Sequence, residues 1–351
     1  HYTSDIRLVN AFSSSYEKRV WICSESEWNR LDSSVTHLSV NASCLNELSE
    51  LRLNRLIVLK ELVIGDGSLN GLNELRLDGL NGLERVVIGS NSLKRVGEGH
   101  VMRVEACSRL RSVVIGDQSL IHYSELTISG VPLLEEIRIG SSSFVDLSAL
   151  QLDGLSGLER AVIGSNSMTS VEGIFSLTNC ASVSELVVGD GSMRSFQSVT
   201  ISAVPLLATI TIGSDSLKNV DSFVLSGLSG LESVVIGSDS FSQRSGHFTL
   251  TSPSVKALVV GDGSFSQYTD CSIHDVPSLE TLSIGDNSFV ASSLELKNLN
   301  GLKSVVIGRR GFENCERAVF ESLPELTSIQ LGWSALSFRD IDNATLVMKS
   351  V

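Results

Sequence analysis

The stretch LERVVIGSNSL, residues Leu83–Leu93, returns along the 351-residue chain with small changes. Close copies are LERAVIGSNSM at Leu158–Met168 and LESVVIGSDSF at Leu231–Phe241. Self-similarity at a fixed period is the mark of a repeat protein, in which one coil cannot bury its apolar side alone and stacked coils share one core. The repeat therefore decides the architecture before any single residue is considered.

The glycine that follows the apolar pair marks the frame of each copy. It recurs from Gly65 to Gly332, and Asn41 takes its place in an earlier copy, which gives thirteen copies. Most steps are 24 residues, but the step from Gly89 to Gly116 is 27. A longer period also exists, because related VP segments begin at Val131, Val204 and Val276. We infer that a cassette of three repeats was duplicated.

Each copy predicts a short strand followed by a tight turn. Val86 and Ile88 alternate with Val87, which is the period of a strand with one buried face. Gly89 ends this strand, and we expect it to allow a positive φ and a tight exit turn. Ser92 belongs to a column of serines whose small size lets turns stack and whose hydroxyl can hold the backbone of the next coil. The Leu, Phe or Met that follows is expected to point inward.

A second apolar pair lies between successive strands of this kind, as in Leu75/Leu77 and Leu294/Leu296. The residue between the members of a pair is usually polar or β-prone, which predicts a second short strand with one buried face. We predict a β-rich solenoid of about thirteen 24-residue coils, each with two short parallel strands on opposite sides of a thin core, and little helix. At a strand spacing of about 4.8 Å the rod is roughly 60 Å long.

Two regions organise the chain. Residues 1–34 lack the repeat frame, contain VWICSESEWNRL, and are expected to cap the exposed core of the first coil. Residues 35–351 form the solenoid. Its last segment, TLVMKSV at Thr345–Val351, matches SFVLSGL at Ser222–Leu228 and stops within a coil, which predicts an uncapped end that continues in a longer protein or is covered by something else.

The segment Leu83–Leu93 resembles the L-x-x-L-x-L-x-x-N-x-L segment of leucine-rich repeats. The narrower pattern I-G-x-x-S-F is similar to the I-G-x-x-A-F of BspA-like surface proteins of bacteria and protists, and CSRL at Cys107 matches their C-x-x-L. The chain departs from the family in having glycine in place of proline after the strand and a mixed asparagine column. The resemblance implies a right-handed, curved solenoid with an adhesion or recognition role at a cell surface.

Composition restricts the compartment and the partners. The net charge of −13 and the pI of about 4.9 argue against nucleic acid or an anionic membrane as a partner. No apolar run approaches the roughly 18 residues of a membrane span. Sequons at Asn41 and Asn343 are candidate glycosylation sites. Together these features favour an extracellular or cell-surface location.

Four of the six cysteines form two pairs with different expectations. Cys23 and Cys44 flank the junction between cap and first coil, where they either form a disulfide or remain free thiols. Cys107 and Cys180 lie three coils apart, roughly 14 Å by strand spacing, which is too far for a disulfide. Both are expected to be buried thiols of the core.

No arrangement of residues predicts chemistry. The six histidines occupy unrelated positions of the repeat, and the sequence holds no zinc-protease, phosphate-loop or serine-hydrolase motif. Turn aspartates form a broken column that a calcium site or a solvated acidic edge would explain, and one carboxylate per turn is a thin ligand set. We expect no metal, no cofactor and no enzyme activity. The aspartates are Asp66, Asp117, Asp190, Asp262 and Asp286.

The middle residue of the first strand should point out onto the open face of the sheet. This row is rich in valine, which reflects β-propensity or marks a contact surface for another protein. Glu61, Arg85, Glu136, Arg160 and Glu185 are expected to rim it with alternating charge. The row is Ser39, Val63, Val87, Val114, Arg138, Val162, Val187, Thr211, Val235, Val259, Ser283, Val306 and Gln330.

The sequence therefore predicts a surface or secreted module that binds a protein or glycan partner through this face, in adhesion or recognition. Ten residues are the candidate contacts: Val63, Val87, Val114, Arg138, Val162, Val187, Thr211, Val235, Val259 and Val306. The alternative is a structural protein that associates with itself into a coat, matrix or filament.

Overall fold

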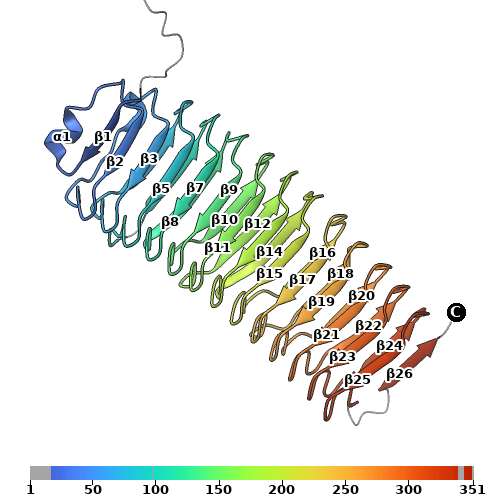
Figure 1. The fold of residues 1–351 in the computed structure, drawn as a ribbon. Helices are drawn as coiled ribbons and strands as arrows, with labels where there is room; N and C mark the ends of the chain where they lie inside the picture. Colours follow the sequence, from blue (N-terminus) through green and yellow to red (C-terminus); the bar gives the residue numbers. More distant parts are fainter. Residues whose placement is uncertain (1–16, 98, 339–343, 350–351) are drawn as a thin grey trace, which may run out of the picture.

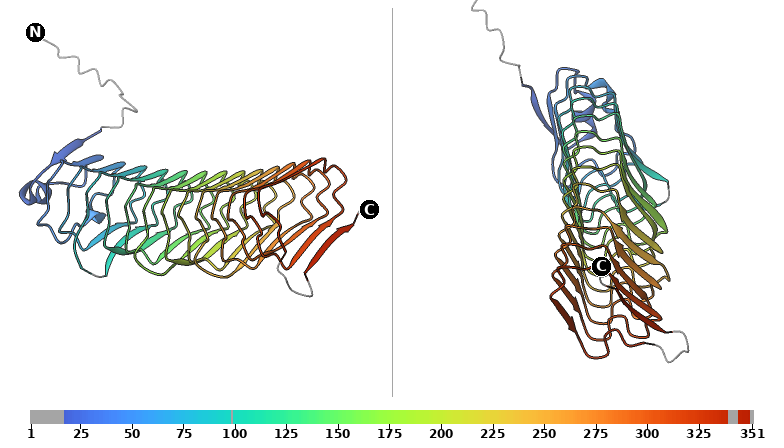
Figure 2. Two further views of the ribbon diagram at one scale, coloured as in Figure 1. Left: turned by 90° about the horizontal axis from the view of Figure 1, so that it is seen from below. Right: turned by 90° about the vertical axis from the view of Figure 1, so that its right-hand side faces the viewer.

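The computed structural model describes residues 17–97, 99–338 and 344–349, which form one elongated rod (Figure 1). Its strands lie across the rod axis and stack coil upon coil. Two layers of strands face each other across a narrow interior (Figure 2). This β-solenoid confirms the fold class that the 24-residue repeat predicts.

The first layer, here called the main sheet, is a continuous sheet of fourteen parallel strands in sequence order. Every strand has four residues, and every neighbouring pair is in register without a bulge. The strands are β1 (Arg19–Ile22), β2 (His37–Val40), β3 (Glu61–Ile64), β5 (Arg85–Ile88), β7 (Ser112–Ile115), β9 (Glu136–Ile139), β11 (Arg160–Ile163), β13 (Glu185–Val188), β15 (Thr209–Ile212), β17 (Ser233–Ile236), β19 (Ala257–Val260), β21 (Thr281–Ile284), β23 (Ser304–Ile307) and β25 (Ser328–Leu331).

The second layer holds the strands predicted from the second apolar pair. A 3-10 turn, η1 (Leu53–Arg55), takes the place of its strand in the first coil. The strands are β4 (Glu74–Asp78), β6 (His100–Glu105), β8 (Tyr123–Ser129), β10 (Ala149–Asp153), β12 (Gly173–Thr178), β14 (Phe196–Ser202), β16 (Ser222–Ser226), β18 (His247–Thr251), β20 (Asp270–His274), β22 (Ser293–Lys297), β24 (Arg317–Glu321) and β26 (Thr345–Lys349).

The second layer is interrupted, unlike the main sheet. It divides into sheets of three, three and six strands, with breaks between β8 and β10 and between β14 and β16. Both breaks follow a seven-residue strand at the same place in the duplicated three-repeat cassette. Bulges occur at His100/Val101 and at Gly173/Ile174. The extra residues of irregular coils are therefore absorbed on this side of the rod.

The core is one continuous apolar cluster along the rod. Val86 and Ile88 point inward from β5 while Val87 is only half-buried, as the alternation predicts. The inward residue after the turn is Leu or Met in most early coils and Phe in most later ones. Phe241, Phe265 and Phe289 stack with ring centroids 4.7 Å apart, so the later coils add ring stacking to simple apolar burial.

Glycine recurs after the main-sheet strands for a different reason from the one expected. Gly89 and Gly164 do not have a positive φ; in that turn the left-handed residues are Asn91 (φ 59°) and Leu93 (φ 56°). Instead, a Cβ on Gly164 would lie 2.5 Å from the backbone nitrogen of Ser141 in the preceding coil. The expectation of a positive φ was wrong, because it is the close approach of the neighbouring coil that excludes a side chain here.

The serine column forms a buried ladder of hydrogen bonds, but toward the preceding coil rather than the next. The Ser167 hydroxyl donates to the Gly140 carbonyl at 2.9 Å and accepts from the Ser143 backbone N–H at 3.2 Å. The same pair of bonds recurs along the rod, for example at Ser92. A buried hydroxyl that satisfies two backbone groups at once is stabilising because neither group can reach water.

The segment before the first coil joins the main sheet and covers its end. Strand β1 pairs with β2, and helix α1 (Glu25–Asn29) follows it. Ser24 caps this helix, and hydrogen bonds from the backbone N–H groups of Cys23 and Ser24 hold the pKa of the Glu27 carboxyl below its usual value. A disulfide joins Cys23 to Cys44, whose Cα atoms are 4.8 Å apart. The cap is therefore tied to the first coil.

Candidate functional site

The outward face of the main sheet is built from the first and third residues of each four-residue strand, because the second and fourth are buried in the core in every strand from β2 to β23. The structure places all thirteen third-position residues, from Ser39 to Gln330, side by side in one unbroken row. This row brings together side chains that are about 24 residues apart in sequence.

Exposure varies along the row. Val235 and Val259 are exposed, with 38% and 40% of their surface open to solvent, whereas Val63, Val87 and Val114 are half-buried between their neighbours. Val162, Val187 and Val306 are half-buried as well, and Arg138, Thr211 and Gln330 are exposed. The surface is therefore a shallow one of short side chains rather than a groove.

Trp21 extends the row at its first end, although the repeat frame does not predict it. It lies opposite Ser39 in the register of β1 and β2, and 61% of its surface is exposed. The segment RVWI alternates Val20 and Ile22 around Trp21 in the way that the repeated strands do. That alternation was the available indication, but the segment lacks the glycine frame.

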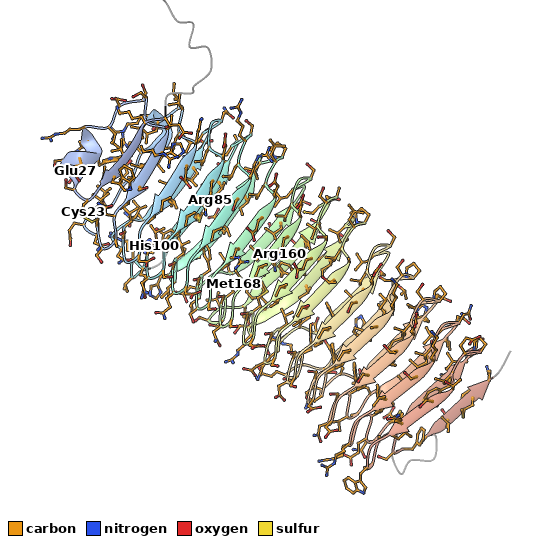
Figure 3. All side chains as sticks on the ribbon, viewed as in Figure 1. Cys23, Glu27, Arg85, His100, Arg160 and Met168 are labelled. Atoms are coloured by element: carbon orange, nitrogen blue, oxygen red, sulfur yellow. A yellow bond between two sulfur atoms is a disulfide. The ribbon has the colours of Figure 1, made fainter. Side chains whose placement is uncertain are left out.

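The charged rim is largely self-paired. Arg85 forms an ion pair with Glu61 of the preceding coil at 2.9 Å, and Arg160 pairs with Glu185 of the next at 2.6 Å. Figure 3 labels these two arginines. Arg138 lies 3.7 Å from Glu136 of its own strand. The alternating charges that the sequence predicts are present, but they pair with charges of a neighbouring coil or of their own strand.

The two halves of the outward face differ in charge. From β2 to β13, charged residues such as Glu61 and Arg85 often occupy the first outward position. From β15 to β25 no outward position of a strand is charged. These twelve residues are Thr209, Thr211, Ser233, Val235, Ala257, Val259, Thr281, Ser283, Ser304, Val306, Ser328 and Gln330.

The turn aspartates have a structural use. The carboxylate of Asp66 accepts the backbone N–H of Ser90 in the next coil at 2.8 Å, and that of Asp190 accepts the N–H of Ser214 at 2.7 Å. Among the described residues no group of three or more His, Cys, Asp or Glu side chains is placed to hold a metal ion. The column therefore ties coils together.

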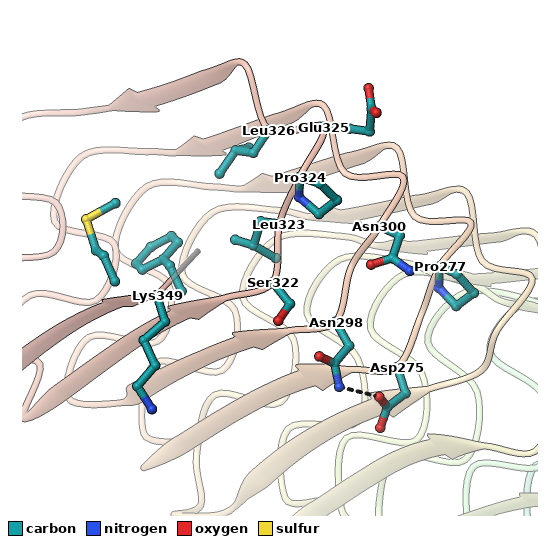
Figure 4. Close-up of a pocket in the computed structure, with 12 residues that line it drawn as sticks. Asp275, Pro277, Asn298, Asn300, Ser322, Leu323, Pro324, Glu325, Leu326 and Lys349 are labelled. Carbon is teal, nitrogen blue, oxygen red and sulfur yellow. Dashed lines mark hydrogen bonds between the residues drawn. The ribbon is translucent and has the colours of Figure 1, made fainter. Parts of the chain in front are cut away.

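A hollow with a volume of about 1350 Å³ lies near the last described coil. Its lining includes Asp275, Asn298 and Lys349 (Figure 4). Asp275 accepts a hydrogen bond from Asn298 at 2.7 Å and contacts His274 at 2.9 Å. These contacts fix the corner of the coil.

The remaining candidates are placed as follows. Asn41 is exposed in the turn after β2, whereas Asn343 lies outside the described residues. Cys107, Cys180, Cys271 and Cys315 are buried and free of disulfides. None of the described helices combines the length and the hydrophobicity that a membrane crossing needs.

Three comparisons with known proteins found one similar chain, among the solved structures. No family model matches the chain, and no curated protein matches it. Among solved structures, a leucine rich cell surface protein from Faecalibacterium prausnitzii matches 85% of this chain and 83% of its own, with 15% sequence identity and a TM-score of 0.23. By its own coil geometry the chain is a β-solenoid of parallel strands.

Proposed function

We propose that the protein is a non-enzymatic recognition module, secreted or displayed at a cell surface, that binds another macromolecule through the outward face of the main sheet. The observation that carries this proposal is the unbroken row from Ser39 to Gln330, on strands that pair in register without a bulge. A rigid face with short side chains and self-paired charges suits contact with a complementary surface and offers no group for catalysis.

The shape of the face restricts the partner. Thirteen strands at about 4.8 Å spacing and four residues at about 3.3 Å each give a strip of roughly 60 by 13 Å, or about 800 Å². One partner of a typical specific complex contributes about that area. A ligand must therefore run along most of the rod to bind stably, which favours an elongated partner or an extended surface over a small ligand.

A protein partner fits the face better than a glycan. Sugar rings stack on aromatic side chains, and Trp21 is the single aromatic residue among the third-position residues from Trp21 to Gln330. Valine, serine and threonine offer flat packing and hydrogen bonds instead. The disulfide between Cys23 and Cys44 supports an oxidising compartment such as the cell exterior.

The test compares two double variants that add the same charge to opposite layers. Val162→Asp with Val235→Asp changes the row, and Ile174→Asp with Val224→Asp changes exposed residues of β12 and β16 in the second layer. Each protein is applied at nanomolar concentration to arrays of extracellular proteins and of glycans. We expect the first variant to lose the targets of the natural protein and the second to keep them. Equal binding by both, with unchanged circular dichroism, would place the site elsewhere.

A further inference from the structure

The second half of the outward face, from β15 to β25, is bordered by a row of alternating charges. Beside its twelve uncharged outward residues, the margin where the strands begin carries four charges in alternating order: Glu232, Lys256, Glu280 and Lys303. They form two ion pairs within the chain, at 3.0 and 2.9 Å, yet all four side chains are more than half exposed. Ala208 before β15 and Thr327 before β25 end this charged stretch on both sides.

Alternating charges of even number are complementary to themselves when the order is reversed. A two-fold axis parallel to the strands, placed between β19 and β21, turns a second copy face to face with the first and reverses the order of its coils. Glu232 then lies opposite Lys303 of the second copy, and Lys256 lies opposite Glu280. By symmetry each contact occurs twice, so four opposite-charge contacts form and no like-charge contact does.

The residues between the margins also fit this arrangement. Val235 lies opposite Val306 of the second copy, and Val259 lies opposite Ser283. All of these side chains are short, so two such faces can approach without a protruding group. The uncharged face is also where two chains of net charge −13 meet with the least repulsion.

The first half of the sheet does not offer the same fit. Its margin contains the alternating residues Lys60, Glu84, Arg111 and Glu135, which are also complementary to themselves, but here charges occupy the face itself as well. An axis between β5 and β7 would set Glu61 opposite Glu136 of the second copy twice. Of the two halves, only the segment from β15 to β25 can therefore face a second copy of itself without bringing like charges together.

We infer that this segment is a self-recognition surface, on which a second copy of the chain docks face to face and antiparallel to form a closed dimer. The area is modest: six strands at about 4.8 Å, by roughly 17 Å including the margin, give about 490 Å² per copy and about 1,000 Å² in total. That is at the lower limit for a specific interface. The dimer is accordingly weak, with a dissociation constant on the order of micromolar or above.

The dimer goes beyond the proposed function and uses a part of the same sheet. Binding of another macromolecule at nanomolar concentration involves the monomer, whereas at higher concentration the second copy occupies the segment from β15 to β25 and competes for it. Self-association thus limits access to the binding face.

The test is complementation of charge, measured by sedimentation equilibrium of the full chain from about 1 μM to about 1 mM. Lys256→Glu alone and Glu280→Lys alone each create two like-charge contacts in the dimer, and each should raise the dissociation constant at least about tenfold. In an equimolar mixture of the two variants, every contact between position 256 of one chain and position 280 of the other again joins opposite charges, so the heterodimer is restored. Glu159→Lys is the matched control, because it makes the same charge change at an equivalent exposed margin position before β11.

The outcomes separate the two proposals. A monomer over the whole range, equal effects of Glu280→Lys and Glu159→Lys, or no association in the mixture would each overturn the dimer. None of these results touches capture of another macromolecule at nanomolar concentration, which Val162→Asp with Val235→Asp tests. Surface charges at these positions contribute little to folding, and circular dichroism verifies that every variant is folded.

Discussion

The main sheet and the second layer are made by the same coils, yet one is regular and the other is not. The main sheet runs through fourteen strands of four residues each. The second layer has strands of five to seven residues, two bulges and two breaks. The difference shows that the spacing of the coils is fixed at the corner that follows each main-sheet strand, whereas the opposite side of the rod tolerates changes in length.

The two corners show why. After a main-sheet strand, the glycine faces the backbone of the preceding coil, and Gly213 has no more room for a Cβ than Gly164. After a second-layer strand, a Cβ on Gly154 would meet nothing within 4 Å, and Ala106 and Ala203 occupy the equivalent position with φ of 52° and 54°. The first corner holds glycine in every coil from Gly65 to Gly332, whereas the second accepts several residue types.

The largest expected effect comes from placing the same methyl group at each corner. Gly164→Ala puts a Cβ 2.5 Å from the backbone of Ser141, so two coils must separate, and we expect a loss of about 3 kcal/mol of unfolding free energy. Gly154→Ala meets open space and adopts a left-handed conformation that other coils already tolerate with alanine, so it should cost about 1 kcal/mol. Urea denaturation followed by circular dichroism measures both.

Equal destabilisation by the two substitutions would show that close stacking is not what distinguishes the corners. Gly237→Ala serves as a second main-sheet case, because its Cβ would lie 2.4 Å from the backbone nitrogen of Ser214. It should behave like Gly164→Ala.

A middle-sized effect is expected from the serine ladder. Ser167→Ala leaves the Ser143 N–H and the Gly140 carbonyl without their buried partner, and should cost about 1–3 kcal/mol. Ser252, at the second-layer corner, bonds the Leu225 carbonyl at 3.1 Å. Cys180 takes the same position in another coil and makes a similar bond to its preceding coil at 3.4 Å.

Ser252→Cys should therefore change the unfolding free energy by less than about 1 kcal/mol, because the thiol replaces the hydroxyl as it does at position 180. Thermal unfolding of both variants in a reducing buffer gives the comparison. A tolerated Ser167→Ala would mean that the ladder is incidental to coil stacking.

The smallest effect is expected from lengthening the second layer. The coil with the 27-residue step already holds three extra residues before its second-layer strand. Val101 pairs with Glu74 of the preceding coil. Val101 lies eight residues after Leu93, whereas Glu74 lies only five residues after Leu69, the equivalent of Leu93. Two glycines inserted after Asn219 should cost at most about 1 kcal/mol, since loop closure depends weakly on length. The same insertion after Ser214, in the main-sheet corner, should prevent cooperative unfolding measured by fluorescence and circular dichroism.

Much of the fold can be predicted from the sequence because the same pattern of apolar residues recurs in every coil. The alternation at Val86 and Ile88 predicts the main sheet, and Leu75 and Leu77 predict the second layer. The row of outward residues follows from the same alternation. The breaks after β8 and β14 could not be predicted, because they depend on how two complete coils fit and not on the apolar pattern of either.

The candidate site was less predictable than the fold. The sequence indicates alternating charges at Glu61 and Arg85 but not that they pair with each other, because that requires the strand register. Strand β1 was missed, and Trp21 with it, because β1 lacks the frame glycine. The prediction that Gly89 has a positive φ was wrong for a related reason, because the close approach of neighbouring coils arises only when the coils stack.

The strands' direction across the rod has a mechanical consequence. When the two ends of such a rod are pulled apart, the load falls on the hydrogen bonds of one coil at a time, so coils peel off in sequence instead of shearing together. A coil that occupies about 4.8 Å of the rod releases roughly 80 Å of extended chain, since about 24 residues span at most about 3.5 Å each. The solenoid is thus expected to lengthen under modest tension in equal steps, one coil at a time.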